Sequence, residues 1–75
     1  MVTKTEKLIY HIAKELIEMF PEGGDYPFGV PEEACMDSAK AHNSFPDPDV
    51  GKVDTDYLAE DIWDEIQKLQ KRRSK

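Results

Sequence analysis

Apolar residues recur at helical spacing near the start of the chain. At 100° per residue they form one stripe over residues 4–19. The stripe consists of Leu8, Ile12, Leu16 and Met19. Thr3-x-x-Glu6 is typical of a capping box, and Pro21 ends the pattern because a residue before proline is disfavoured in the α region. The pattern therefore predicts a helix over about residues 4–19.

The apolar side of this first stretch is unusually wide. Ile9, Tyr10, Ala13 and Ile17 extend it to an arc of roughly 200°. A helix with one face in water needs less apolar surface than this. We therefore expect the first helix to be central, contacting two other elements or a second copy of the chain in a homodimer.

A second, shorter stretch covers about residues 31–42. Proline is favoured in the first turn of a helix, and the acids that follow Pro31 suit the positive end of the helix dipole. Its expected inner face consists of small groups: Cys35, Ser38, Ala39 and His42. Asn43 is a plausible helix end.

A third stretch runs over about residues 55–72, with Asp54 as a good N-cap. Its apolar stripe consists of Leu58, Ile62, Ile66 and Leu69. Acids fill its first half and bases its last turns, which complements the helix dipole and places Asp64 and Lys68 as a favourable i,i+4 pair.

Two Pro/Gly/aromatic segments separate the three stretches, at residues 20–30 and 43–53. We expect both to be ordered loops, held to the core by aromatics such as Tyr26, Phe28 and Phe45. The fold class is all-α: one small three-helix domain over residues 1–75, with two long loops. No apolar run approaches the 18 residues of a membrane span, and the N-terminal sequence does not resemble a secretory signal.

The charge is strongly uneven along the chain. The formal total is −6, but residues 21–66 hold thirteen acids against Lys40 and Lys52, whereas residues 67–75 hold five bases and no acid. An acidic body repels a nucleic-acid backbone and attracts a basic protein surface. The simpler interpretation is that the acids only keep the chain soluble.

Candidate catalytic and metal-binding groups are sparse. Cys35 and His42 lie about 10 Å apart along one helix, too far for a nucleophile and its base. The single cysteine favours a reducing, cytoplasmic location, and the histidines lack zinc-ligand spacing. Residues 47–56 carry alternating aspartates that resemble an EF-hand or dockerin calcium loop, although the spacing departs from that motif. We expect no enzyme activity and no cofactor.

One aromatic lies among acids in the third stretch. Trp63 sits at the edge of its apolar stripe, where it covers a loop or meets a partner. The candidate partner-binding residues are Trp63, Asp56, Glu60, Asp64 and Glu65. We expect an acidic, non-catalytic protein-binding module, such as a phage- or mobile-element-type inhibitor that mimics nucleic-acid charge. The alternatives are a nucleic-acid-binding accessory protein that uses the basic C-terminus, or weak divalent-cation binding by residues 47–56.

Overall fold

The protein folds as three helices, in a computed structural model that describes residues 2–21 and 29–73, with side chains as far as Gln70. The helices are α1 (Lys4–Met19), α2 (Glu32–Ser44) and α3 (Thr55–Arg73). The described residues contain no strand, which confirms the predicted all-α class. Within them, none of the helices combines the length and the apolar character that crossing a membrane requires.

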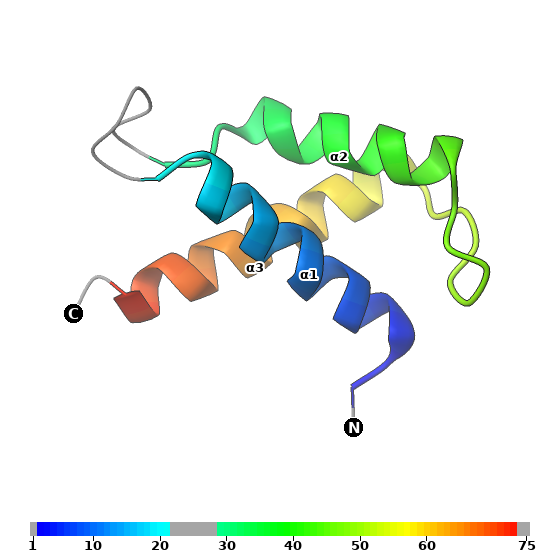
Figure 1. Ribbon diagram of the computed structural model, residues 1–75, viewed down its shortest axis with the longest axis horizontal. Coiled ribbons are helices and arrows are strands. Elements are labelled where there is room, and N and C mark those ends of the chain that lie inside the picture. The colour runs from blue at the N-terminus through cyan, green and yellow to red at the C-terminus, as the bar shows by residue number, and fades with distance from the viewer. Residues whose placement is uncertain (1, 22–28, 74–75) are drawn as a thin grey trace.

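The central helix is α3, not α1. It passes behind both other helices in Figure 1 and packs against each of them, whereas α1 and α2 barely touch each other. Leu58, Ile62 and Ile66 of α3 are fully buried. Helix α1 does contact two other elements, as expected, but the central position belongs to α3, because its apolar stripe, although narrower, meets a partner helix on each side.

Helix α1 begins at the predicted capping box. The Thr3 side chain accepts a hydrogen bond from the Glu6 N–H at 3.1 Å, and the Glu6 carboxylate accepts from the Thr3 N–H at 3.0 Å. The bond from the Thr3 N–H to the Glu6 carboxylate, followed by the interaction of the Thr3 side chain with that carboxylate, lowers the pKa of Glu6 from its ordinary value of 4.5. Two donors that the first turn would leave unpaired are thereby satisfied.

The buried face of α1 is rotated from the predicted stripe. Its buried residues are Ile9, Ala13, Leu16 and Ile17. Leu8 and Ile12 are only half-buried, and Met19 is 68% exposed. The chain itself therefore covers most of the wide apolar arc of α1.

Helix α2 begins at Glu32, after Pro31, and continues past Asn43 to Ser44. Its inner face is made of small residues as predicted, with Cys35 and Ala39 fully buried. Asn43 does not end the helix. It lies inside the last turn, where its side chain binds the segment that leads into α3.

The aromatics of the two loops do not act as predicted where they are described. Phe45, which directly follows α2, is 89% exposed and does not hold the second loop to the core. Tyr26 and Phe28 lie outside the described residues. The second loop is instead held by polar contacts: the His42 Nε2 donates to the Gly51 carbonyl at 3.0 Å, and Asn43 binds Val53. Gly51 has a φ of 76°, the left-handed region that suits glycine at this turn.

Candidate acidic groove between α2 and α3

A groove of about 450 Å³ lies between the first half of α2 and the first turns of α3. Four carboxylates line it, two from each helix: Glu32, Glu33, Asp56 and Glu60. Met36 and Ala59 contribute the apolar part of the lining. No lysine or arginine among the described residues borders the groove. The groove therefore has a high density of negative charge around an apolar floor.

Local structure explains why acids lie at this place. Glu32 and Glu33 occupy the first turn of α2, and Asp56 occupies the first turn of α3, where carboxylates interact favourably with the helix dipole. Asp54 caps α3, since its Oδ1 accepts from the Tyr57 N–H at 3.1 Å. Because α2 and α3 pack against each other, the acidic first turns of both helices contribute to one groove.

The predicted site residues divide between two places. Asp56 and Glu60 line the α2–α3 groove. Asp64 and Glu65 line a different groove, of about 240 Å³, between α3 and α1. Trp63 is half-buried and packs against the hydrophobic core. The five residues therefore share one helix but do not surround one pocket.

Sequence reasoning missed the contribution of α2 and did not include the exposed aromatic of α3 among the site residues. Glu32, Glu33 and Met36 belong to the groove, although nothing in the spacing of α2 indicates which groove its first turn would join. Tyr57, rather than Trp63, is the strongly exposed aromatic of α3, at 62%. Its position nearly opposite the Ile62 stripe is the signal that could have identified it.

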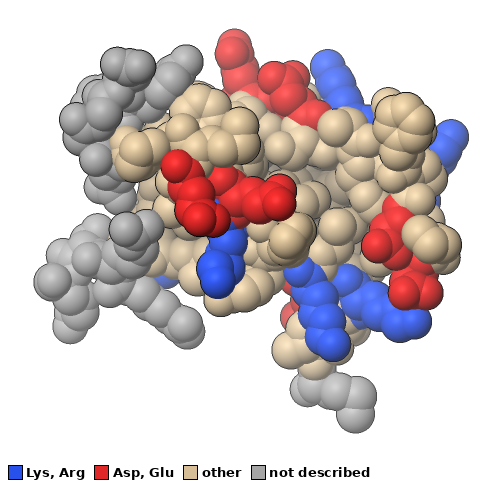
Figure 2. Space-filling view, in the orientation of Figure 1, with Lys and Arg blue, Asp and Glu red and all other residues tan. Residues whose placement is uncertain are grey.

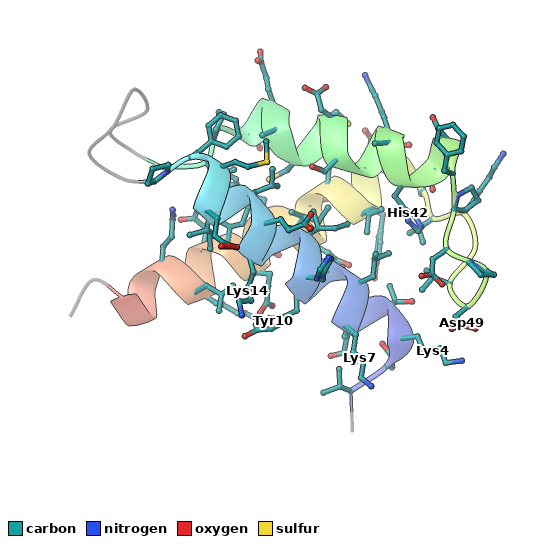
Figure 3. The ribbon with its side chains drawn as sticks, in the orientation of Figure 1. Lys4, Lys7, Tyr10, Lys14, His42 and Asp49 are labelled. Atoms are coloured by element: carbon teal, nitrogen blue, oxygen red, sulfur yellow. The ribbon has the colours of Figure 1, made fainter. Side chains whose placement is uncertain are left out.

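The face that carries α1 is not uniformly acidic. Figure 2 shows lysine side chains interspersed with acids on this side of the molecule. On α1, His11 pairs with Glu15 at 3.1 Å and the Lys14 ammonium lies 5.4 Å from the centre of the Tyr10 ring. Figure 3 shows Tyr10 and Lys14 side by side on the helix. The charged residues of the groove are all acidic, whereas the surface of α1 carries charges of both signs.

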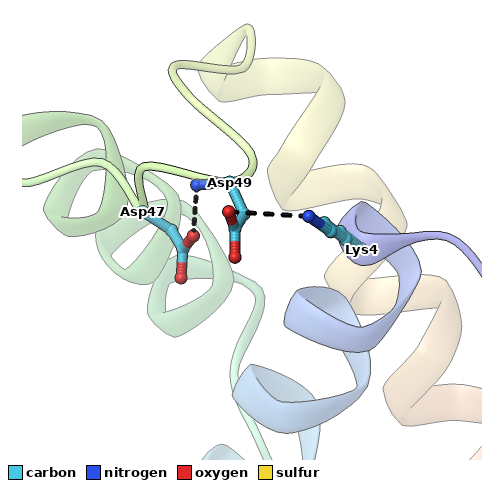
Figure 4. Close-up of polar contacts among 3 residues, drawn as sticks. All are labelled: Lys4, Asp47 and Asp49. Atoms are coloured by element: carbon cyan, nitrogen blue, oxygen red, sulfur yellow. Dashed lines mark hydrogen bonds and ion pairs between the residues drawn. The ribbon is translucent and has the colours of Figure 1, made fainter.

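The aspartates at residues 47–56 are engaged in local structure. Asp47 accepts a hydrogen bond from the Asp49 N–H at 2.8 Å, and Asp49 pairs with Lys4 at 3.5 Å (Figure 4). Asp54 caps α3. Within residues 2–21 and 29–70, no three His, Cys, Asp or Glu side chains gather in a way that could hold a metal ion. The cation-binding alternative for this loop is therefore not supported.

Cys35 and His42 do not form a reactive pair. Cys35 is fully buried, and burial, together with the nearby Glu32 carboxylate, raises the pKa of its thiol to about 11. The thiol is therefore protonated at neutral pH and is a poor nucleophile. His42 instead donates to the Gly51 carbonyl and holds the second loop.

No known protein family, curated protein or solved structure matches this chain.

Proposed function

We propose that this chain is an acidic, non-catalytic module that binds a basic segment of another protein in the groove between α2 and α3. The observation that carries the proposal is the combination of four carboxylates with an apolar floor, in a groove that no described lysine or arginine borders. Lysine and arginine side chains match this arrangement, since their aliphatic stems pack on apolar surface while their charged ends remain outside. The Met36 and Ala59 side chains would pack against the aliphatic stems, and the carboxylates would pair with the charged ends.

The finer proposal is that the module inhibits a nucleic-acid-binding protein by occupying its basic surface. Acids at positions 56, 60, 61, 64 and 65 of α3 lie within ten residues, whose nine steps cover about 13.5 Å of helix. The mean spacing along the helix axis is one negative charge in roughly 3 Å, close to the 3.4 Å that separates successive phosphate charges of one DNA strand. A phage- or mobile-element-type inhibitor and a cytoplasmic location belong to the same proposal. Trp63, at the edge of this acidic run, would be an anchor for the partner.

A titration with a labelled basic peptide tests the proposal. Fluorescence anisotropy of a short arginine-rich peptide should rise to saturation as the protein is added at about 50 mM salt, and binding should weaken at about 200 mM. Glu33→Gln with Glu60→Gln should raise the dissociation constant at least tenfold, because the charges that hold the peptide are removed. Unchanged binding in this variant would place the interface elsewhere.

A matched control distinguishes the effect of the groove carboxylates on peptide affinity from the effect of the net charge. Glu15→Gln with Glu18→Gln changes the charge by the same amount on the exposed side of α1 and should leave peptide affinity within about twofold. A labelled DNA duplex tests the rival function in the same assay. Binding of the duplex, lost when residues 71–75 are removed, would favour a nucleic-acid-binding protein that uses its basic C-terminus.

A further inference from the structure

Tyr57 lies in the first turn of α3 and carries an exposed ring. Its side chain is 62% exposed, and it does not belong to the hydrophobic core. Among residues 2–21 and 29–70, no group forms a hydrogen bond or a ring contact with this side chain. The packing of the chain itself therefore does not explain why an aromatic residue stands at this position.

The position of Tyr57 is fixed relative to the carboxylates of the α2–α3 groove. Asp54 caps α3 by accepting a hydrogen bond from the Tyr57 N–H at 3.1 Å, so the backbone of Tyr57 is held in the first helical turn. Asp56, which lines the groove, directly precedes Tyr57, and Glu60, which also lines it, follows three residues later. Side chains three residues apart on a helix are neighbours, with Cβ atoms about 5–6 Å apart. One side chain of a partner can therefore contact both the Tyr57 ring and the Glu60 carboxylate.

An aromatic ring beside a carboxylate suits arginine better than lysine. The guanidinium of arginine is planar, so it can stack on an aromatic ring while its N–H groups pair with a carboxylate. The ammonium of lysine is a compact and strongly hydrated charge that offers no plane for stacking. Lysine still approaches a tyrosine ring within this chain, since the Lys14 ammonium lies 5.4 Å from the centre of the Tyr10 ring (Figure 3). We therefore expect a preference for arginine and not an exclusion of lysine.

We propose that Tyr57 makes the α2–α3 groove prefer arginine to lysine in the basic segment that it binds. An arginine of the partner pairs with the Glu60 carboxylate and stacks its guanidinium on the Tyr57 ring. Trp63, the other large aromatic of α3, is half-buried against the core and offers less open surface. This preference rests on the proposed function of the groove and narrows its partner to a segment rich in arginine, the residue that binds phosphate groups through two parallel hydrogen bonds.

Two peptides of equal length and charge, one with arginines and one with lysines, test this preference. By fluorescence anisotropy at about 50 mM salt, the parent should bind the arginine peptide about fivefold more tightly than the lysine peptide. Tyr57→Leu should lower this ratio about threefold by weakening binding of the arginine peptide. Tyr57→Phe should keep the ratio, because the ring and not the hydroxyl stacks. Tyr10→Leu is the matched control, since it removes the exposed tyrosine of α1 and should leave the ratio unchanged.

Proton resonances of the bound arginine peptide report the stacking directly. Protons that lie over an aromatic ring resonate upfield of their usual position. The δ-methylene protons of an arginine should therefore shift upfield on binding to the parent and to Tyr57→Phe, but not on binding to Tyr57→Leu. Circular dichroism should give the same helix content for all three chains, because Tyr57 lies outside the core.

The contrary results distinguish the role of Tyr57 from the role of the groove. Equal affinities of the parent for the two peptides, or the same ratio in Tyr57→Leu as in the parent, would overturn the role of Tyr57 and leave the groove as the binding site. An upfield shift that persists in Tyr57→Leu would overturn that role too. Failure of the parent to bind either peptide would contradict the proposed function, and the arginine preference with it.

Discussion

Asn43 binds both main-chain polar groups of Val53, ten residues further along the chain. Its Oδ1 accepts from the Val53 N–H at 2.9 Å, and its Nδ2 donates to the Val53 carbonyl. The same Nδ2 also donates to the Thr55 Oγ1 at 3.0 Å, at the start of α3. One amide side chain therefore joins the last turn of α2 to the first turn of α3. It thereby holds the two helices that form the acidic groove.

Replacing Asn43 should measure this connection. Asn43→Ala leaves the Val53 N–H and carbonyl without partners in a half-buried position, which costs about 1–3 kcal/mol. Urea unfolding followed by circular dichroism would report the loss. Ser44→Ala is the matched control, because the Ser44 hydroxyl donates only to the Lys40 carbonyl of its own helix. Equal losses in the two variants would contradict the role given to Asn43.

The buried face of α3 should matter more than the stripe predicted for α1. Ile62 is fully buried in α3, whereas Ile12 of α1 is half-buried. Ile62→Ala should therefore destabilise the protein by about 2–5 kcal/mol, and Ile12→Ala by less than half as much. Thermal melts of the two variants would test the order. A larger loss at Ile12 would restore α1 as the central helix.

The thiol of Cys35 should make stability fall at high pH. Burial raises its pKa to about 11 in the folded protein, against an ordinary value of 9.0. Between these values the unfolded chain loses the thiol proton while the folded chain keeps it, so this contribution is complete below pH 9 and is lost as the pH rises. The slope is at most about 1.4 kcal/mol per pH unit.

Cys35→Ala isolates this slope from the titration of lysines and tyrosines. Unfolding free energies measured from pH 8 to pH 11 should decline less steeply in the variant than in the parent. In the same way, a thiol reagent at neutral pH should modify Cys35 only as fast as the protein unfolds. Rapid modification of the folded protein would show that the thiol is accessible.

The helices could be predicted because their ends are encoded locally. Thr3 and Glu6 cap α1, Pro31 precedes α2, and Asp54 caps α3, each through contacts within a few residues. Their arrangement could not be predicted in the same way. The apolar arc of α1 is so wide that periodicity alone does not select Ile9 over Leu8 as its buried centre.

The candidate site was predicted only in part for a similar reason. The acids of α3 are evident from the sequence, but a groove needs two walls. The second wall, Glu32, Glu33 and Met36, depends on how α2 packs across α3. The role of Asn43 could not be predicted either. An asparagine near a helix end more often ends the helix than binds a loop residue ten positions away.

The most direct test of the central claim is a nuclear magnetic resonance titration of isotope-labelled protein with the arginine-rich peptide. The account predicts that the largest amide shifts fall on the residues that line the α2–α3 groove: Glu32, Glu33, Met36, Asp56, Ala59 and Glu60. Shifts confined to the last turn of α3 or to α1, or no saturable shift at low salt, would contradict it.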